Sequence, residues 1–144
     1  VNQGKVMPTI RQYKDSTDRI QVVELWQKVF GYETAHNEPN LAISKKIATN
    51  DGLFFVAVEN TEVVGTIMAG YDGHRGWLYS VAVDPKIRLN GLGSSLVQHA
   101  EKALADLGCM KVNLQLLDTN EATAAFYKSI GYSVEPRLSM GKVL

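Results

Sequence analysis

Apolar residues recur along the chain with two different spacings, and each spacing predicts one kind of element. The clearest helix is expected over residues 91–107, where apolar side chains fall three and four positions apart, and Gly108 ends it. A second helix is expected from residues 15–18, any of which could cap it, to about Phe30. Its apolar stripe consists of Val22, Trp26, Val29 and Phe30.

Two shorter helices are expected on weaker patterns. Pro39 stands where a first helical turn would begin, and Leu41, Ile43, Ile47 and Ala48 follow with helical spacing. The other helix starts at a cap formed by Asp118 or Asn120 and ends at Gly131. Its inward-facing residues should be Ala122, Ala125, Phe126 and Ile130.

Segments rich in valine, isoleucine and phenylalanine predict the strands. Asn60-Thr61 and Asp72-Gly73 read as hairpin turns between them, and Asp84-Pro85 ends the third consecutive strand. The expected strands cover residues 9–13, 53–59, 62–71, 77–83 and 111–117, with closing strands at 132–134 and 137–141. This order predicts an α+β (mixed α/β) fold, in which four helices flank a mostly antiparallel twisted sheet of about six to seven strands.

The 144 residues are expected to form a single domain over positions 1–144, with 1–8 as a flexible N-terminal extension. Fifteen basic and fifteen acidic residues give no net charge, which argues against nucleic-acid or acidic-membrane partners. The apolar stretches are too short to cross a bilayer, and no export signal opens the sequence, so a cytoplasmic protein is expected. One cysteine and three scattered histidines predict neither an internal disulfide nor a metal site.

The segment between the third consecutive strand and the clearest helix, residues 88–95, carries two glycines. Such a junction leaves backbone N–H groups at the positive end of a helix dipole, where they can bind phosphate oxygens. The segment lacks the lysine of a P-loop, and Leu96 stands where a dinucleotide fingerprint needs glycine or alanine. Nucleotide hydrolysis and NAD binding are therefore disfavoured.

Two motifs resemble those of the GNAT superfamily of acetyltransferases. Residues 78–85, Leu-Tyr-Ser-Val-Ala-Val-Asp-Pro, followed by Arg88-x-x-Gly91-x-Gly93, resemble its acetyl-coenzyme A signature. Residues 120–132, Asn-Glu-Ala-Thr-Ala-Ala-Phe-Tyr-Lys-Ser-Ile-Gly-Tyr, resemble its second motif. The hairpin at residues 70–76 is similar to that of small bacterial YpeA-type members.

The resemblance implies a GNAT-like fold and acetyl-CoA as co-substrate, without a metal. It implies that the backbone of Val81, Ala82 and Val83 pairs with the pantetheine arm. Backbone amides would hold the pyrophosphate; they belong to Leu89, Asn90, Gly91, Leu92, Gly93 and Ser94. Arg88 would lie beside the phosphates or be an ordinary surface arginine, and Asn120 would contact the coenzyme arm while also capping a helix.

Tyr127 is the expected catalytic residue, because a phenol with an ordinary pKa near 10 can give a proton to a departing thiolate. It lies about 100° around the helix from Phe126, off the predicted apolar stripe. The general base stays open. Gln115 stands where relatives that act on protein N-termini carry glutamate, and Tyr79 could relay a proton through water. Three further candidates are Asp72, His74 and His36, which read more simply as hairpin or loop residues.

These observations predict a GNAT-type N-acetyltransferase that moves an acetyl group from acetyl-CoA to a primary amine by direct attack in a ternary complex. Gln115 in place of glutamate favours a small-molecule acceptor, bound in part by the loop at residues 31–40. A protein N-terminal or lysine acetyltransferase is the alternative within the enzyme class. A non-catalytic acyl-CoA-binding regulatory module is the alternative outside it, and the resemblance leaves a homodimer open.

Overall fold

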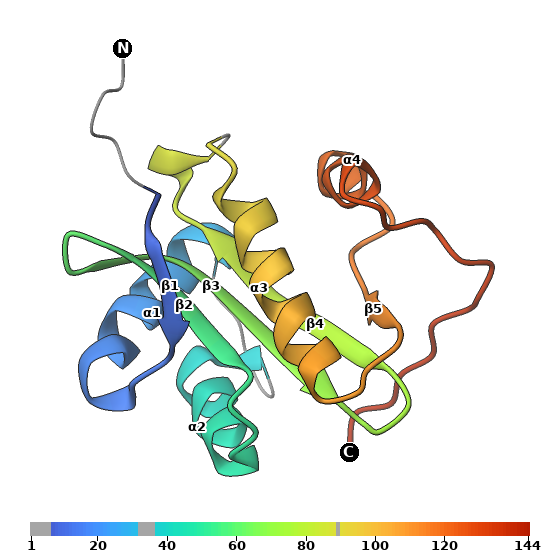
Figure 1. Ribbon diagram of the computed structural model, residues 1–144, viewed down its shortest axis with the longest axis horizontal. Coiled ribbons are helices and arrows are strands. Elements are labelled where there is room, and N and C mark those ends of the chain that lie inside the picture. The colour runs from blue at the N-terminus through green and yellow to red at the C-terminus, as the bar shows by residue number, and fades with distance from the viewer. Residues whose placement is uncertain (1–6, 32–36, 89) are drawn as a thin grey trace.

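The computed structural model describes residues 7–31, 37–88 and 90–144, which form one mixed sheet with helices on both faces (Figure 1). The five strands found in these residues pair in chain order: β1 (Thr9–Gln12), β2 (Phe54–Glu59), β3 (Glu62–Tyr71), β4 (Gly76–Val83) and β5 (Val112–Leu114). The helices are α1 (Asp15–Phe30), α2 (Pro39–Thr49), α3 (Leu92–Asp106) and α4 (Glu121–Ser129). The first four strands are antiparallel, and β5 lies parallel to β4. Of the predicted N-terminal extension, residues 1–6 lie outside the described part.

Two apolar cores lie on opposite faces of the sheet, because successive strand residues point to opposite sides. Phe55 and Ala57 of β2 join the core under α3, which reaches Tyr127 of α4. Phe54 and Val56 join the other core, under α1 and α2. The predicted α+β architecture with four helices is therefore confirmed.

Both predicted hairpin turns are present. Asn60 and Thr61 have φ values of 50° and 68°, as a two-residue hairpin loop requires. In the β3–β4 turn, the carboxylate of Asp72 accepts the N–H groups of His74 and Arg75 at 2.8 and 2.7 Å. These bonds hold the pKa of Asp72 below its usual range. Asp72 and His74 are thus exposed hairpin residues, as their simpler interpretation predicted.

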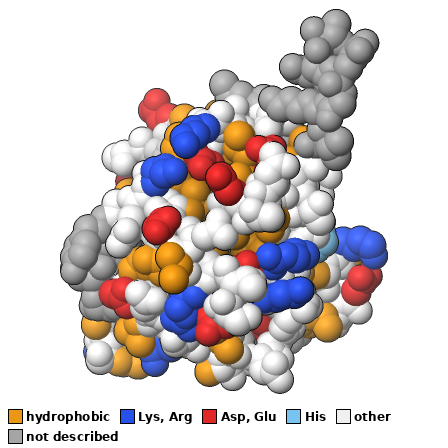
Figure 2. Space-filling view, turned by 90° about the vertical axis from the view of Figure 1, so that its left-hand side faces the viewer, with side chains coloured by type: hydrophobic (Ala, Val, Ile, Leu, Met, Phe, Trp, Pro, Cys, Tyr) orange, Lys and Arg blue, Asp and Glu red, His pale blue; other side chains and the backbone are white. Residues whose placement is uncertain are grey.

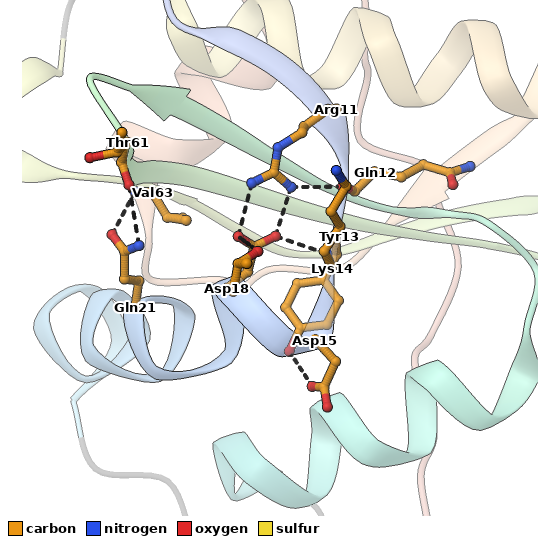
Figure 3. A network of polar contacts seen from close by, with 10 residues as sticks. Arg11, Gln12, Tyr13, Lys14, Asp15, Asp18, Gln21, Thr61 and Val63 are labelled. Atoms are coloured by element: carbon orange, nitrogen blue, oxygen red, sulfur yellow. Dashed lines mark hydrogen bonds and ion pairs between the residues drawn. The ribbon is translucent and has the colours of Figure 1, made fainter.

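The start of α1 differs from the sequence-based expectation. None of residues 15–18 caps the helix; the N-cap is Lys14, without a side-chain cap, and all four lie in the first turn. Asp18 is instead buried and accepts both Arg11 Nη1 and Nη2, at 2.7 and 2.9 Å, and the Lys14 N–H at 2.8 Å (Figure 3). Burial opposes its charge, but these hydrogen bonds prevail and lower the pKa of Asp18. The carboxylate thereby ties β1 to α1.

The predicted closing strands at 132–134 and 137–141 are wrong, and the sheet has five strands among the described residues rather than six to seven. The C-terminal segment, residues 132–144, follows β5 through side chains. Gln115 Nε2 donates to Ser139 Oγ at 2.6 Å, and Asn113 Nδ2 donates to Glu135 at 2.8 Å. Pro136 has no N–H for a ladder, and the Arg137 N–H bonds locally to the Glu135 carbonyl.

One face of the molecule, shown in Figure 2, carries acidic and basic side chains that alternate without forming a large patch of one sign. This distribution agrees with the balanced count of fifteen basic and fifteen acidic residues. Among the described residues, no helix combines the length and apolar character needed to span a bilayer.

Candidate active site

Strands β4 and β5 pair over only three residues each, from Gly76–Val112 to Leu78–Leu114. β5 then ends, while β4 continues to Val83. Residues 79–83 of β4 therefore have β3 along one edge and no strand of the described chain along the other, and we call this second side the free edge. An unpaired strand edge presents backbone N–H and C=O groups that an extended ligand can bind. In Figure 1, β5 and α4 lie on one side of α3, and β1 to β3 lie on the other.

A β-bulge interrupts β4 at this point. Thr66 of β3 is in register with Ala82, but Met68 is in register with Tyr79, so two β4 residues oppose one β3 residue. Ser80, inside the bulge, has the left-handed φ of 50°. As a result, Leu78 and Val81, three positions apart, both pack against the core under α3.

The bulge also reverses which backbone groups face the free edge. The Gly76 N–H donates to the Lys111 carbonyl on the β5 side, whereas the Asp84 N–H donates to Val64 on the β3 side. In a regular strand these two even-numbered residues would face the same edge. Counting back from Asp84, the backbone groups of Val81 and Val83 face the free edge, and those of Ala82 face β3. Of the three predicted pantetheine-binding residues, Val81 and Val83 thus have backbone groups on the free edge, where the Val83 carbonyl accepts a hydrogen bond from Arg88 Nε at 3.3 Å.

The predicted phosphate-binding junction connects β4 to α3. Gly91 is the N-cap of α3 with a φ of 89°, and a Cβ at this position would meet nothing within 4 Å. The Asn90 side chain accepts the Leu92 N–H at 3.1 Å, and no side chain of the N-cap covers the helix start. The positive end of the α3 dipole is therefore open to an anion such as a phosphate. Leu89 lies outside the described residues.

Three further predicted residues lie near this junction or on the helix that packs against it. Arg88 is exposed, and its Nε donates to the Val83 carbonyl at 3.3 Å, which holds the guanidinium beside the end of β4. Gly93 brings α3 close to α4, since a Cβ there would lie 3.3 Å from the Phe126 ring. Asn120 caps α4 by accepting the Thr123 N–H at 3.2 Å, so its predicted capping role is confirmed. Its contact with a coenzyme stays a prediction.

Tyr127 is the most buried side chain of α4, at 7% exposure, which corrects the expectation that it lies off the inward face. Ala122 and Ala125, expected inside, are exposed. The Tyr127 ring belongs to the core under α3 and packs edge-on against Phe126 and Tyr132, with centroids 5.0 and 5.5 Å apart. Burial raises the pKa of Tyr127 to about 12. The phenol therefore stays protonated at neutral pH.

A hollow of about 1290 Å³ lies between β5, α4 and the C-terminal segment. Tyr127 and Gln115 both line it, so the structure brings the predicted proton donor and this acceptor-side residue to one cavity. Tyr79 does not line it; its ring is 41% exposed and lies 5.3 Å from Nζ of the buried Lys46. His36 and half of the predicted acceptor loop, residues 32–36, lie outside the described residues.

Comparison with known proteins decides the family. The model of the Acetyltransferase (GNAT) family matches residues 19–132. The chain belongs to this family. It is therefore a GNAT-type N-acetyltransferase, as its two motifs predicted, and the finer likeness to YpeA-type members stays a prediction.

Several solved structures of other proteins share the fold of this acetyltransferase. PaiA N-acetyltransferase from Thermoplasma acidophilum, in complex with coenzyme A, superposes with a TM-score of 0.80 at 17% identity, covering 92% of this chain and 93% of that one. An aminoglycoside N-acetyltransferase in complex with CoA gives 0.78 at 19% identity, covering 99% and 98%. The ribosomal-protein-S18-alanine N-acetyltransferase from Escherichia coli gives 0.69 at 25% identity, covering 87% and 77%.

Two carboxylates of the acetyltransferase that line the hollow were not singled out from the sequence. Glu101 of α3 accepts the Tyr132 hydroxyl at 2.6 Å. Glu135 binds Lys111 and Asn113, and the hydrogen bond from Lys111 is the main cause of its lowered pKa. Each contact joins residues more than 20 positions apart, so no local pattern could have identified it.

Proposed function

We propose that this acetyltransferase binds acetyl-CoA along the free edge of β4 and transfers the acetyl group directly to the primary amine of a small molecule. The observation that carries this proposal is the junction of the free edge with the open, glycine-capped start of α3. The free edge suits an extended amide-containing arm, and the start of α3 suits a pyrophosphate. The two adjoin in the chain, as a ligand with both parts requires.

Two features of the described chain support this placement of the coenzyme. The Val81 and Val83 backbone groups that face the free edge would bind the arm, because β5 ends before reaching them. Space around Gly91 lets phosphate oxygens approach the start of α3, and the Arg88 guanidinium lies nearby as a counter-charge. Bound acetyl-CoA supplies the thioester from which the acetyl group is taken.

Tyr127 would then act as the proton donor. Transfer forms a bond between the amine nitrogen and the acetyl carbon and breaks the bond from that carbon to sulfur. The departing thiolate needs a proton, and a phenol whose pKa is raised to about 12 carries one at neutral pH. The proton lost from the attacking amine passes to solvent or to a carboxylate of the hollow. The active form is thus a complex that holds both substrates together.

The hollow supports a small polar acceptor. Its lining combines carboxylates and cations rather than one sign of charge: Glu101, Asp118, Glu135, Arg75, Lys111, Lys128 and Arg137. The aminoglycoside N-acetyltransferase of the same fold is named for a small amine substrate. Gln115, an amide, cannot serve as the base that glutamate would provide at this position in relatives that act on protein N-termini.

An acceptor panel tests this proposal. Release of free thiol from acetyl-CoA would be followed with amino sugars, polyamines, amino acids and short peptides, and products identified by mass spectrometry. We expect release that depends on a small amine. Transfer confined to peptides would instead establish the alternative that the Escherichia coli relative suggests, since that enzyme is named for a ribosomal-protein alanine. Tight coenzyme binding with no transfer to any acceptor would contradict the catalytic proposal.

We also propose that the acetyltransferase acts in the cytoplasm as a homodimer. Support for the dimer comes from the outer edge of β5, which pairs with no strand of the described chain. Leu138 and Met140 of the C-terminal segment are also exposed apolar side chains. Light scattering coupled to size exclusion would give twice the chain mass. A monomer at micromolar concentration would contradict this proposal.

A further inference from the structure

The bulge in β4 is held by a side-chain connection that crosses three elements. The Thr66 hydroxyl, on β3, donates to the Ser80 carbonyl inside the bulge at 2.9 Å. The same hydroxyl accepts the Trp26 indole N–H, from α1, at 2.8 Å. Thr66 is 0% exposed and Trp26 is 4% exposed, so neither bond competes with water. The bond from Thr66 to Ser80 gives the bulge a partner that ordinary strand pairing does not supply.

We propose that Thr66, oriented by Trp26, is a positioning residue that fixes the β4 bulge and thereby sets the backbone N–H of Val81 for the acetyl carbonyl oxygen. This inference rests on the proposed function, since it concerns acetyl-CoA bound at the free edge. Neither residue touches the hollow; both act through the backbone of Ser80.

The bulge needs a specific partner because its conformation is unfavourable by itself. Ser80 has a φ of 50°, which lies in a region that residues other than glycine, asparagine and aspartate rarely adopt. Such a residue persists only when its surroundings hold it, and strained backbone of this kind concentrates at functional sites. A fully buried hydroxyl that donates to the carbonyl of that same residue is such a restraint.

The orientation of Thr66 is itself determined by packing. The Trp26 ring stacks on Phe54 of β2 at a centroid distance of 6.1 Å and lies in the core under α1 and α2. With its acceptor position occupied by the Trp26 N–H, the Thr66 hydroxyl directs its hydrogen to Ser80. The position of β4 at the bulge thus depends on the core on the far side of the sheet from α3.

The consequence for catalysis follows from the reversal of backbone direction at the bulge. Without it, the N–H of Val81 would face β3 instead of the free edge. A donor aimed at the oxygen where charge develops accelerates acyl transfer, and misplacement by about 1 Å can cost up to about 100-fold in rate. The phosphate-binding junction lies beyond the bulge and should hold the coenzyme whether or not the bulge is well fixed.

Four variants test the inference. Thr66→Val removes the hydroxyl at nearly constant volume, and Thr66→Ser keeps it. Trp26→Phe removes the indole N–H together with part of the ring volume. The double variant Thr66→Val with Ser80→Gly places glycine where the positive φ is needed. Measurements are kcat for acetyl transfer, Kd for coenzyme A, and the backbone amide resonances of Ser80, Val81 and Ala82.

We expect Thr66→Val to lower kcat at least about tenfold, while Kd for coenzyme A changes less than about threefold. Thr66→Ser should stay within about threefold of the wild-type kcat, and Trp26→Phe should lower kcat by about three- to tenfold, because the Thr66 hydroxyl loses the N–H that orients it. Adding Ser80→Gly to Thr66→Val should recover part of the loss. If Thr66→Val does not fold, Thr66→Ala with and without Ser80→Gly takes its place. Equal kcat in the valine and serine variants, or no recovery with glycine, would overturn the inference.

The amide resonances separate this inference from the proposed function. In Thr66→Val, the amides of residues 80–82 should shift before any coenzyme is added, whereas those in the β3–β4 hairpin should not. If the wild-type protein transfers no acetyl group, the proposed function fails but the amide shifts still test the bulge. If transfer occurs and the amides do not move, the inference alone fails.

Discussion

At the scale of single residues, burial decides the chemistry of Tyr127. The side chain is 7% exposed, and loss of hydration raises the pKa of its phenol to about 12. A lone half-buried tyrosine would be unremarkable in a core. Its place on the wall of the hollow is the observation on which the proposed proton-donor role depends. The same burial leads to two expectations, one for activity and one for stability.

Tyr127→Phe should lower turnover at least about tenfold, equivalent to about 1.4 kcal/mol of barrier, because the ring packing stays while the donor proton is lost. Coenzyme A affinity should stay within about twofold. Tyr71→Phe is a matched control, since its hydroxyl bonds only to the Gly73 carbonyl in the β3–β4 turn. Steady-state kinetics of the three proteins measures the effect. Equal turnover in wild type and Tyr127→Phe would remove the proton-donor role.

Tyr127 should also make the fold sensitive to alkali. Its pKa is about 12 when folded and about 10 when unfolded, so the unfolded chain loses the proton first. The raised pKa of Tyr127 contributes roughly 2–3 kcal/mol to the free energy of unfolding below pH 10, and this contribution is lost as the pH rises from 10 to 12. Urea denaturation of wild type and Tyr127→Phe at pH 9 and pH 12 measures it. A constant difference between the two proteins would contradict the raised pKa.

At the scale of elements, helices and hairpins were predictable and strand pairings were less so. α3 and α4 begin and end close to the predicted positions, because 3.6-residue spacing and caps such as Asn120 are local signals. The end of β5 and the missing closing strands depend on partners far away in sequence. The bulge at Ser80 could not be foreseen either, since it follows from the register between β3 and β4.

The candidate site, like the elements, was predictable only where its features are local in sequence. The glycine-capped start of α3 was predicted from residues 88–95 alone, because a helix start with an open glycine is a local property. The burial of Tyr127 and the contacts of Glu135 were missed, because they depend on how α4 and the C-terminal segment pack against β5. Thr66 carried no signal, since one threonine in an apolar strand is ordinary.

The open helix start can be tested with a charge. Gly91→Glu should weaken coenzyme A binding at least about tenfold, because a carboxylate would occupy the space at the positive end of α3. Gly73→Glu provides the control: it has the same φ of 89° and equally open space, but lies in the β3–β4 hairpin. Titration calorimetry would measure the affinity of each variant for coenzyme A. Equal affinities would show that phosphate binds elsewhere.

The connection of β1 to α1 predicts sensitivity to acid. Asp18→Asn should lower the free energy of unfolding at pH 7 by about 1–3 kcal/mol, since Arg11 loses its carboxylate partner. The pKa of Asp18 is lowered in the fold, so its contribution is present above the unfolded value near 3.9 and is lost as the pH falls through the folded one. The difference between wild type and variant should therefore shrink as the pH falls below about 3.9, which urea denaturation at pH 7 and in acid would show. A difference that persists in acid would contradict this account.

At the scale of the whole molecule, the two cores meet at the site. The core under α1 and α2 reaches Ala82 and, through Trp26 and Thr66, the Ser80 carbonyl. The core under α3 reaches Val81, Val83 and Tyr127. β4 lies between them, and its residues 79–83 continue beyond the last residue pair with β5. The proposed transfer site is thus a property of the whole sheet rather than of one motif.

The most direct test of this account is a crystal structure of the protein with coenzyme A. We expect the coenzyme arm to pair with the backbone of Val81 and Val83, the pyrophosphate to lie at the start of α3, and the thiol to lie within reach of the Tyr127 hydroxyl. A coenzyme bound away from the free edge of β4, or a β5 that pairs along the full length of β4, would contradict the account.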